Sequence, residues 1–314
     1  MMLCKDWYRK GLIFKPDSKN RWNKSHAQVP TPLVLDDRIR VYYSSRDKDN
    51  ISRISFVDLD LKDPEKIINK HSEVVLDIGK PGTFDDCGVM PSWVLMKNNF
   101  IYLYYIGWNV RNTVPYYNSV GLAISNDDGL TFKKYSLGPL WDRNVFEPYF
   151  SASTCVIPFN TGWICYYLSC TEYREYEGKM EPRYHIKIAT SEDGINWKRD
   201  GLIAIDYKHS EEAGIVKASV LKINSEYHMW YSYRNFKDYR NDEMNSYSIG
   251  YAKSSNGIDW ARYDGKMSLN GLSTWDNLME AYPHVIKLDN RLLMFYNGNG
   301  FGETGFGYAE RLLK

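Results

Sequence analysis

The chain has 314 residues, an aromatic content of 15% and a formal net charge of +1 at pH 7. This near-neutral balance offers no electrostatic footprint for nucleic acid or for an anionic membrane surface, so neither is expected as a partner. No apolar run approaches the ~20 residues that a membrane-spanning helix needs. The 26 tyrosines and 10 tryptophans favour a β-rich protein whose rings pack between sheets.

The N-terminal sequence and the cysteines predict a cytoplasmic protein. Segment 1–11 lacks the charged and then apolar pattern of a secretory signal. Scattered thiols without a C-x-x-C pair are expected to be reduced core residues, which is typical of a reducing compartment. The five cysteines are Cys4, Cys87, Cys155, Cys165 and Cys170. We expect neither a metal nor a bound cofactor.

A unit of about 60 residues returns along the chain and is clearest in 86–132, 148–197 and 212–260. Each copy has an apolar strand pattern, an aromatic strand pattern, a third strand pattern and then a tight turn before an aromatic residue. The turns are NDDGLTF, EDGINW and SNGIDW. Matching valines recur at Val34, Val94, Val156, Val220 and Val285. Periods this long, built from short strands, indicate units arranged radially.

The fifth copy lacks a fourth strand, and the start of the chain supplies a match for it. Residues 7–13 repeat residues 197–203 as W-x-R-x-G-L-I. We therefore predict that the N-terminal strand pairs with the last unit and closes a ring, which removes exposed strand edges. The predicted fold is all-β: a five-bladed β-propeller of four-stranded antiparallel blades, forming a single domain over 1–314.

The same topology predicts where a site would lie. The longest irregular segments, 107–117, 170–182 and 235–245, all fall between second and third strands. They share one face of the ring with the starts of the first strands, whereas the D-G hairpin turns lie on the opposite face. Functional side chains are therefore expected at first-strand starts and second-strand ends.

Acidic residues at the first-strand starts are the predicted catalytic groups. Asp86 and Glu212 share a frame, Asp-Cys-Gly-Val and Glu-Ala-Gly-Ile, and Glu280 lies in Glu-Ala-Tyr-Pro-His. The innermost strands converge on the ring axis, so these side chains are expected to meet in one pocket. Cleavage of a glycosidic bond by water uses two carboxyl groups whose environments separate their pKa values.

A further set of side chains is predicted to bind the substrate. Arg46 and Arg234 end second strands in matching frames, and planar guanidinium groups suit sugar carboxylates or phosphates. Aromatic residues of the set could stack on sugar rings. The complete set is His26, Gln28, Arg46, Trp108, Glu147, Lys217, Tyr231, Arg234, Tyr282 and His284. For each member a purely structural role is the alternative.

The S-x-D-G-[IL]-x-W turn after an A-x-S strand resembles the five-bladed propellers of the glycoside hydrolase 43, 32, 117 and 130 superfamily, over essentially the whole chain. Segment 125–132 also fits the sialidase Asp-box, but the other copies lack its spacing, so we interpret it as a turn. The resemblance implies a central funnel with acidic first-strand starts. It places Glu212 where family 43 has its acid, and Glu280 loosely matches the E-G-P sequence of that family. His26-Ala-Gln28 stands where family 43 has its aspartate.

Three functions remain open on these grounds. A glycoside hydrolase is favoured, inverting, with Glu212 as acid and Asp86 or Glu280 holding the water, since carboxylates on separate blades suit the ~6.5–9.5 Å of that mechanism. A phosphorylase or other glycosyl-transferring enzyme of polysaccharide metabolism is the second, because family 130 relatives surround phosphate with basic groups. Here such roles would fall to Arg46, Arg234, Lys217 and His284, with Asp86 as the acid. The third is a sugar-binding propeller without catalysis. The expected partner is a carbohydrate, with phosphate as a second ligand in the phosphorylase case.

Overall fold

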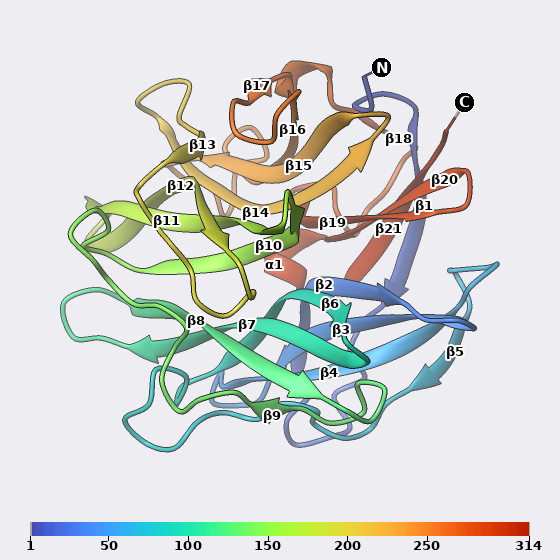
Figure 1. Cartoon of the computed structure of the whole chain (residues 1–314), viewed down its shortest axis with the longest axis horizontal. Helices are drawn as coiled ribbons and strands as arrows, with labels where there is room; N and C mark the ends of the chain where they lie inside the picture. The colour runs from blue at the N-terminus through green and yellow to red at the C-terminus, as the bar shows by residue number, and fades with distance from the viewer. Residues whose placement is uncertain (1, 314) are drawn as a thin grey trace.

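A computed structural model describes residues 2–313, in which antiparallel β-strands supply almost all of the regular structure. Two four-stranded sheets come first in the sequence and are drawn in blue to green in Figure 1. The first contains β2 (Ser25–Val34), β3 (Arg38–Arg46), β4 (Ser52–Asp60) and β5 (Ile67–Lys70). The second contains β6 (Val89–Lys97), β7 (Phe100–Val110), β8 (Tyr116–Ser125) and β9 (Lys133–Lys134).

The middle of the chain forms one eight-stranded sheet made of two antiparallel meanders. The first meander contains β10 (Ser151–Phe159), β11 (Gly162–Tyr176), β12 (Lys179–Ser191) and β13 (Ile203–Ile205). The second contains β14 (Glu212–Ile223), β15 (Glu226–Asn235), β16 (Ser248–Ser254) and β17 (Ala261–Arg262). A single parallel pair, Tyr184 with Gly214, joins the two meanders.

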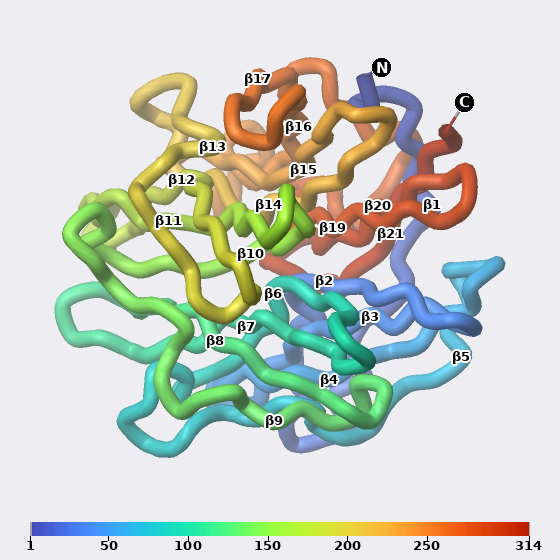
Figure 2. Tube along the Cα trace, in the orientation of Figure 1, coloured from blue at the N-terminus to red at the C-terminus, as the bar shows by residue number. Residues whose placement is uncertain are grey.

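The last sheet combines both ends of the sequence, which lie side by side in Figure 2. Its strands in spatial order are β18 (Leu269–Asn270), β1 (Trp7–Phe14), β21 (Phe306–Leu312), β20 (Arg291–Asn297) and β19 (Ala281–Leu288). A 3₁₀ turn at Asp264–Lys266 and the short α1 (Asn299–Gly302) complete the elements. β1 runs antiparallel to β21. The predicted pairing of the N-terminal strand with the last unit is confirmed.

The first strands of successive units lie next to one another around the centre of the molecule. β2 contacts β6, β6 contacts β10, β10 contacts β14, β14 contacts β19, and β19 contacts β2 again. Each of these five strands breaks its pairing register with the following strand at a comparable position, as in a β-bulge. A bulge bends a strand and re-aims its side chains. At the inner ends of these strands, some side chains therefore point toward the centre that would point elsewhere if the strands alternated regularly.

The D-G and N-G turns connect neighbouring units. Tyr42, Tyr104 and Tyr166, buried in second strands, donate their hydroxyls to the carbonyl oxygens of the turn glycines 129, 194 and 257, at 3.0, 2.6 and 2.7 Å. Gly129 has a φ of +78°, which glycine adopts without steric cost. The repeated turn is thus a packing feature of the fold.

A repeated polar cluster joins the second strand of a unit to a basic residue in or near its fourth strand. The acid between them precedes the first strand in three units and is Asp264, after β17, in the other. In four units a second-strand tyrosine donates its hydroxyl to an acidic residue, and a basic residue pairs with the same acid. The basic residue stands two places after the aromatic residue that follows each turn, or after Trp7 in the last unit. The clusters are Asp85–Tyr105–Lys134, Glu147–Tyr167–Arg199, Asp264–Tyr231–Arg262 and Asp276–Tyr296–Arg9.

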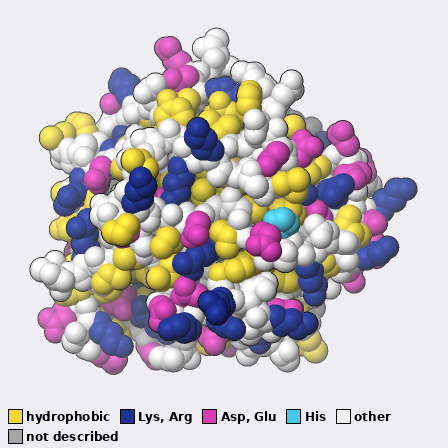
Figure 3. Space-filling model, turned by 90° about the horizontal axis from the view of Figure 1, so that it is seen from below, with side chains coloured by type: hydrophobic (Ala, Val, Ile, Leu, Met, Phe, Trp, Pro, Cys, Tyr) yellow, Lys and Arg dark blue, Asp and Glu magenta, His cyan; other side chains and the backbone are white. Residues whose placement is uncertain are grey.

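Charges of both signs are interspersed on the face of the molecule seen in Figure 3, in keeping with the small net charge. All five cysteines are free, and all but Cys87 are buried. Within residues 2–313, none of the helices has the length and apolar character needed to cross a membrane.

Candidate functional site

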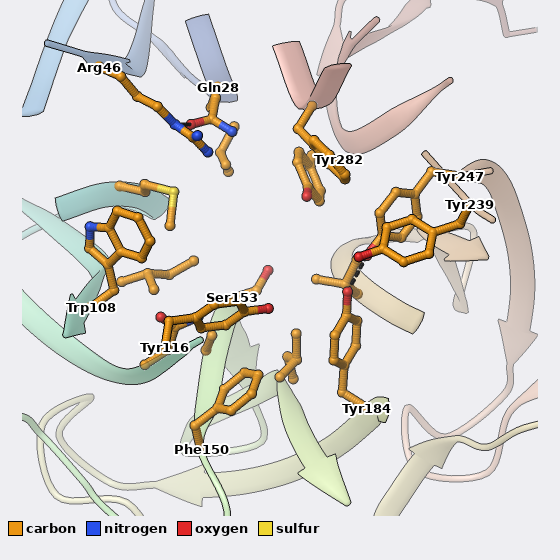
Figure 4. Close-up of a pocket in the computed structure, with 18 of the residues that line it drawn as sticks. Gln28, Arg46, Trp108, Tyr116, Phe150, Ser153, Tyr184, Tyr239, Tyr247 and Tyr282 are labelled. Carbon is orange, nitrogen blue, oxygen red and sulfur yellow. Dashed lines mark hydrogen bonds between the residues drawn. The ribbon is translucent and has the colours of Figure 1, made fainter. Parts of the chain in front are cut away.

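A pocket of about 330 Å³ opens where the five inner strands meet. Every inner strand contributes to its wall close to its break in register: Gln28 from β2, Met90 from β6, Ala152 from β10, Val216 from β14 and Tyr282 from β19. Figure 4 shows Gln28 and Tyr282 among the side chains that converge on this space. The bulges and the ring of inner strands therefore build the cavity together.

Eight aromatic side chains line the pocket (Figure 4). Trp108 stands on one side, and its indole fits because residue 88 is glycine: a Cβ at Gly88 would lie 1.5 Å from Nε1 of Trp108. The remaining aromatic residues of the wall are Tyr116, Phe150, Tyr184, Tyr239, Tyr247, Tyr282 and Phe301. Pockets with apolar rings and a few polar groups are typical small-ligand sites.

Arg46 brings a positive charge to the pocket. Its Nε donates to Oε1 of Gln28 at 2.9 Å, and both side chains point into the cavity in Figure 4. Burial lowers the pKa of this guanidinium, while Tyr282 and Glu303 act in the opposite direction. Among residues 2–313 no carboxylate forms an ion pair with Arg46, and no aspartate or glutamate lines the pocket.

Arg234 lies behind the pocket wall and is almost completely buried. Its guanidinium lies over the ring of Tyr239, at 3.7 Å, and donates to the carbonyl oxygens of Pro182 and Asn235. In front of it the hydroxyls of Tyr184 and Tyr247 form a hydrogen bond. Arg234 was predicted to contact substrate; in the structure it lies outside the pocket wall, behind these tyrosines.

Lys217 and His284 lie together beneath the pocket. Nζ of Lys217 is 2.9 Å from the carbonyl oxygen of Ser92 and 3.3 Å from Nδ1 of His284, whose ring stacks on Trp93. Burial lowers the pKa of Lys217 to about 7 and, with the Lys217 charge, holds the pKa of His284 well below its usual range. Both side chains are buried, so neither reaches the pocket in this conformation.

The three predicted catalytic carboxylates lie outside the pocket wall. Asp86 accepts hydrogen bonds from the Gly82 amide and from Asn109; these, with a contact from Cys87, lower its pKa although burial acts the other way. Glu212 is buried and paired through both oxygens with Arg262, at 2.5 and 2.8 Å.

Glu280 faces a second cleft of about 310 Å³, which Tyr247 separates from the pocket. Arg9 bridges Glu280 and Asp276 in this cleft. Burial raises the pKa of Glu280 to about 7. Glu212 and Glu280 thus pair with basic residues of the repeated clusters, and Asp86 directly follows the acid of another cluster. The expected meeting of the three carboxylates in one cavity is not seen.

Three other predicted binding residues also lie away from the pocket wall. Glu147 is buried beside Arg199, Lys187 and Tyr167 as the acid of its cluster. Tyr231 donates to Asp264 in the corresponding cluster of the next unit. Burial, followed by the charge of Arg46, lowers the pKa of His26 to about 4. Of the predicted binding set, Gln28, Arg46, Trp108 and Tyr282 line the pocket.

We expect Glu212→Gln to lower the free energy of unfolding by about 2–4 kcal/mol, because the amide cannot pair with the buried guanidinium of Arg262. Glu211→Gln, at the exposed neighbouring position, is the matched control and should change stability little. Denaturant titrations of both variants measure the effect. Unchanged stability together with a ~10²–10⁴-fold loss of turnover would instead support the predicted role of Glu212 as acid.

Sequence reasoning missed the third-strand contribution to the pocket. Asn118 and Tyr116 begin β8, Tyr184 lies in β12, and Tyr247 directly precedes β16. Tyr116 and Tyr247 adjoin the irregular connections that lead to β8 and β16. β11 and β12 instead continue as paired strands to the turn at 177–178, so the expected irregular segment 170–182 is mostly strand. Third strands begin where second strands end, so the same topology could have identified them.

No family model matches the chain. The uncharacterised protein Rv1502 of Mycobacterium tuberculosis is 32% identical to it over 305 residues, covering 96% of this chain and 98% of the mycobacterial protein. The chain belongs to the family of this mycobacterial protein. A 1,2-beta-oligomannan phosphorylase of Thermoanaerobacter is 31% identical over 111 residues, 33% of this chain and 36% of the phosphorylase.

The fold is that of the glycoside hydrolase and phosphorylase propellers, which confirms the resemblance seen in the sequence. One solved structure comes from the GH130 family of mannoside phosphorylases, a family described as containing glycoside hydrolases that target β-1,2-mannosidic linkages. It superposes with a TM-score of 0.74 at 15% identity and covers 98% of this chain and 94% of its own.

Proposed function

We propose that the chain is a carbohydrate-active enzyme that binds a glycan in the central pocket. The observation that carries this proposal is the aromatic wall around a space where all five inner strands meet. Ring faces such as those of Trp108 and Tyr282 suit the apolar faces of sugars, and a few polar groups would orient the hydroxyls. The fold shared with glycoside hydrolase and phosphorylase propellers supports the same class of ligand.

The architecture in this proposal is a single five-bladed propeller. The eight-stranded sheet divides into two blades at the single pair between Tyr184 and Gly214, and the five inner strands contact one another in turn. Met1 and Lys314, the ends of the predicted domain, lie outside the described residues. We place the protein in the cytoplasm, where its five free thiols would stay reduced.

Hydrolysis is the first candidate reaction, and the cleft beside Tyr247 provides the specific observation for it. Glu280 in this cleft has a raised pKa, which a general acid needs in order to stay protonated near neutral pH. Asp276 pairs with the same guanidinium, that of Arg9. A substrate that reached from the pocket around Tyr247 would bring its glycosidic bond to this pair. An acid at Glu212 would require the ion pair with Arg262 to open.

Phosphorolysis is the second candidate, supported by the absence of carboxylates from the pocket wall within the described residues. Phosphate is itself the nucleophile in such a reaction, so no carboxylate is required to activate water. Part of the chain is similar to a 1,2-beta-oligomannan phosphorylase. The two candidates separate in one assay: oligosaccharides, including β-1,2-linked mannans, are incubated with and without phosphate. Sugar 1-phosphate indicates phosphorolysis, free sugar without phosphate indicates hydrolysis, and binding without turnover leaves a sugar-binding propeller.

We expect Trp108→Ala to weaken glycan binding about 10-fold, because one stacking face of the pocket is lost. Trp22→Ala, in the loop before β2, is the control and should bind as the unaltered chain does. Titrations of the glycan identified in the assay measure both affinities. Equal affinity of the Trp108→Ala and unaltered chains would place the sugar elsewhere.

A further inference from the structure

Two arginines at the pocket, Arg46 (partly buried) and Arg234 (buried), differ from three other arginines whose side chains are largely covered. Arg40, Arg199 and Arg262 each pair with a buried carboxylate. Arg46 and Arg234 have no carboxylate partner among residues 2–313. The charge of Glu303 acts on the pKa of Arg46, but the two side chains form no ion pair. A guanidinium withdrawn from water without an anion is costly. The molecule therefore keeps an uncompensated positive charge at this pocket.

The free surface of Arg46 has a defined shape. Its Nε is occupied by Gln28, whereas Nη1 and Nη2 have no hydrogen-bond partner in the described part of the chain and face the cavity in Figure 4. Two parallel N–H groups on one edge of a guanidinium match the two oxygens of a carboxylate. Arg240, also in the wall, provides the internal contrast, because Glu181 already occupies its guanidinium at 2.6 and 3.3 Å.

We infer that the pocket is built for a sugar that carries a carboxylate, a uronic-acid residue, with the carboxylate against Nη1 and Nη2 of Arg46. The inference rests on the proposed function only in taking the ligand to be a sugar. The same cavity offers aromatic faces and one open guanidinium edge, so a ligand with both a ring and a carboxylate satisfies both. A free phosphate would leave the aromatic wall uncovered.

Binding measurements on the full chain test the inference without a known reaction. The probes are glucuronate, galacturonate and mannuronate, each beside its neutral hexose, with inorganic phosphate as a separate arm. We expect at least one uronate to bind more than 10-fold tighter than its hexose. Arg46→Gln should lower that affinity ~10–100-fold and lower the hexose affinity much less, because the charge-assisted bidentate contact that is lost is made only to the carboxylate. Arg21→Gln, an exposed arginine near the start of β2, is the charge-matched control and should change neither.

Gln28→Glu provides a second, nearly isosteric variant. It would supply Arg46 with a carboxylate from the protein itself, so uronate binding should fall as in Arg46→Gln while the melting temperature holds or rises. Absence of uronate binding at saturating concentration, equal binding of uronate and hexose, or a preference that survives both variants would overturn the inference. Phosphate binding as tight as uronate would overturn it in favour of a phosphate subsite. If the chain prefers uronates but cleaves no glycoside, the uronate site is supported and the proposed enzymatic function is wrong.

Discussion

Removal of residues 1–14 is expected to leave a chain without a cooperative unfolding transition. β1 lies between β18 and β21 in the last sheet and pairs with both, and Trp7 is fully buried, with its ring centroid 5.8 Å from that of Trp230. Phe14 packs against Tyr43 of the first unit. Loss of one buried tryptophan alone costs ~3–5 kcal/mol, so loss of the whole strand is comparable to the ~5–15 kcal/mol that stabilises a domain.

Circular dichroism melts and denaturant titrations of the shortened chain measure this effect. Trp7→Ala is the graded version and should cost ~3–5 kcal/mol. Tyr8→Ala, at the adjacent and mostly exposed position of β1, should cost little and serves as its control. A shortened chain that melts at the same temperature as the full one would show that the pairing does not stabilise the fold.

Lys217→Met is expected to stabilise the protein at neutral and lower pH. Burial lowers the pKa of Lys217 from its ordinary value of 10.5 to about 7, and its neighbours are His284, held neutral, and the Ser92 carbonyl. Below pH 7 the ammonium of Lys217 is charged in both the folded and the unfolded chain, and burial of this charge destabilises the folded state. Between about 7 and 10.5 the folded chain has released this proton and the unfolded chain keeps it, so stability rises with pH.

The shift corresponds to roughly 4–5 kcal/mol at most. The measurement is the difference in unfolding free energy between the unaltered chain and Lys217→Met at pH 6.5 and pH 9.5. The variant should be more stable at the lower pH, and the difference should shrink at the higher one. Lys222→Met, an exposed position of the same strand, should show neither effect. A difference independent of pH would mean that Lys217 is charged throughout.

The fold was predictable because it is repeated. The similar spacing of Val94, Val156 and Val220 and the match between 7–13 and 197–203 are properties of the sequence alone. They predicted the strand order and the pairing of β1 with β21, which the structure confirms. The number of blades is less direct in the structure, because two meanders share one hydrogen-bonded sheet.

The site was less predictable, for a physical reason that its residues make plain. Acids such as Asp85, Glu147 and Asp276 recur at one position because each neutralises a basic residue of its own unit. A repeat enforced by the fold cannot be distinguished in one sequence from a repeat enforced by catalysis. Arg46 was identifiable by its place at a strand end, but its lack of an anionic partner is visible only in three dimensions.

The pairing of β1 with β21 also sets the order in which the chain can mature on the ribosome. Phe14 is made long before its partner Phe306, about 290 residues earlier, and at ~5–20 residues per second this is roughly 15–60 s of synthesis. During that interval the first strand has no sheet to join, and Trp7 has no place to be buried. The nascent chain therefore carries an unpaired strand through nearly all of its translation, a period in which chaperone binding would matter most.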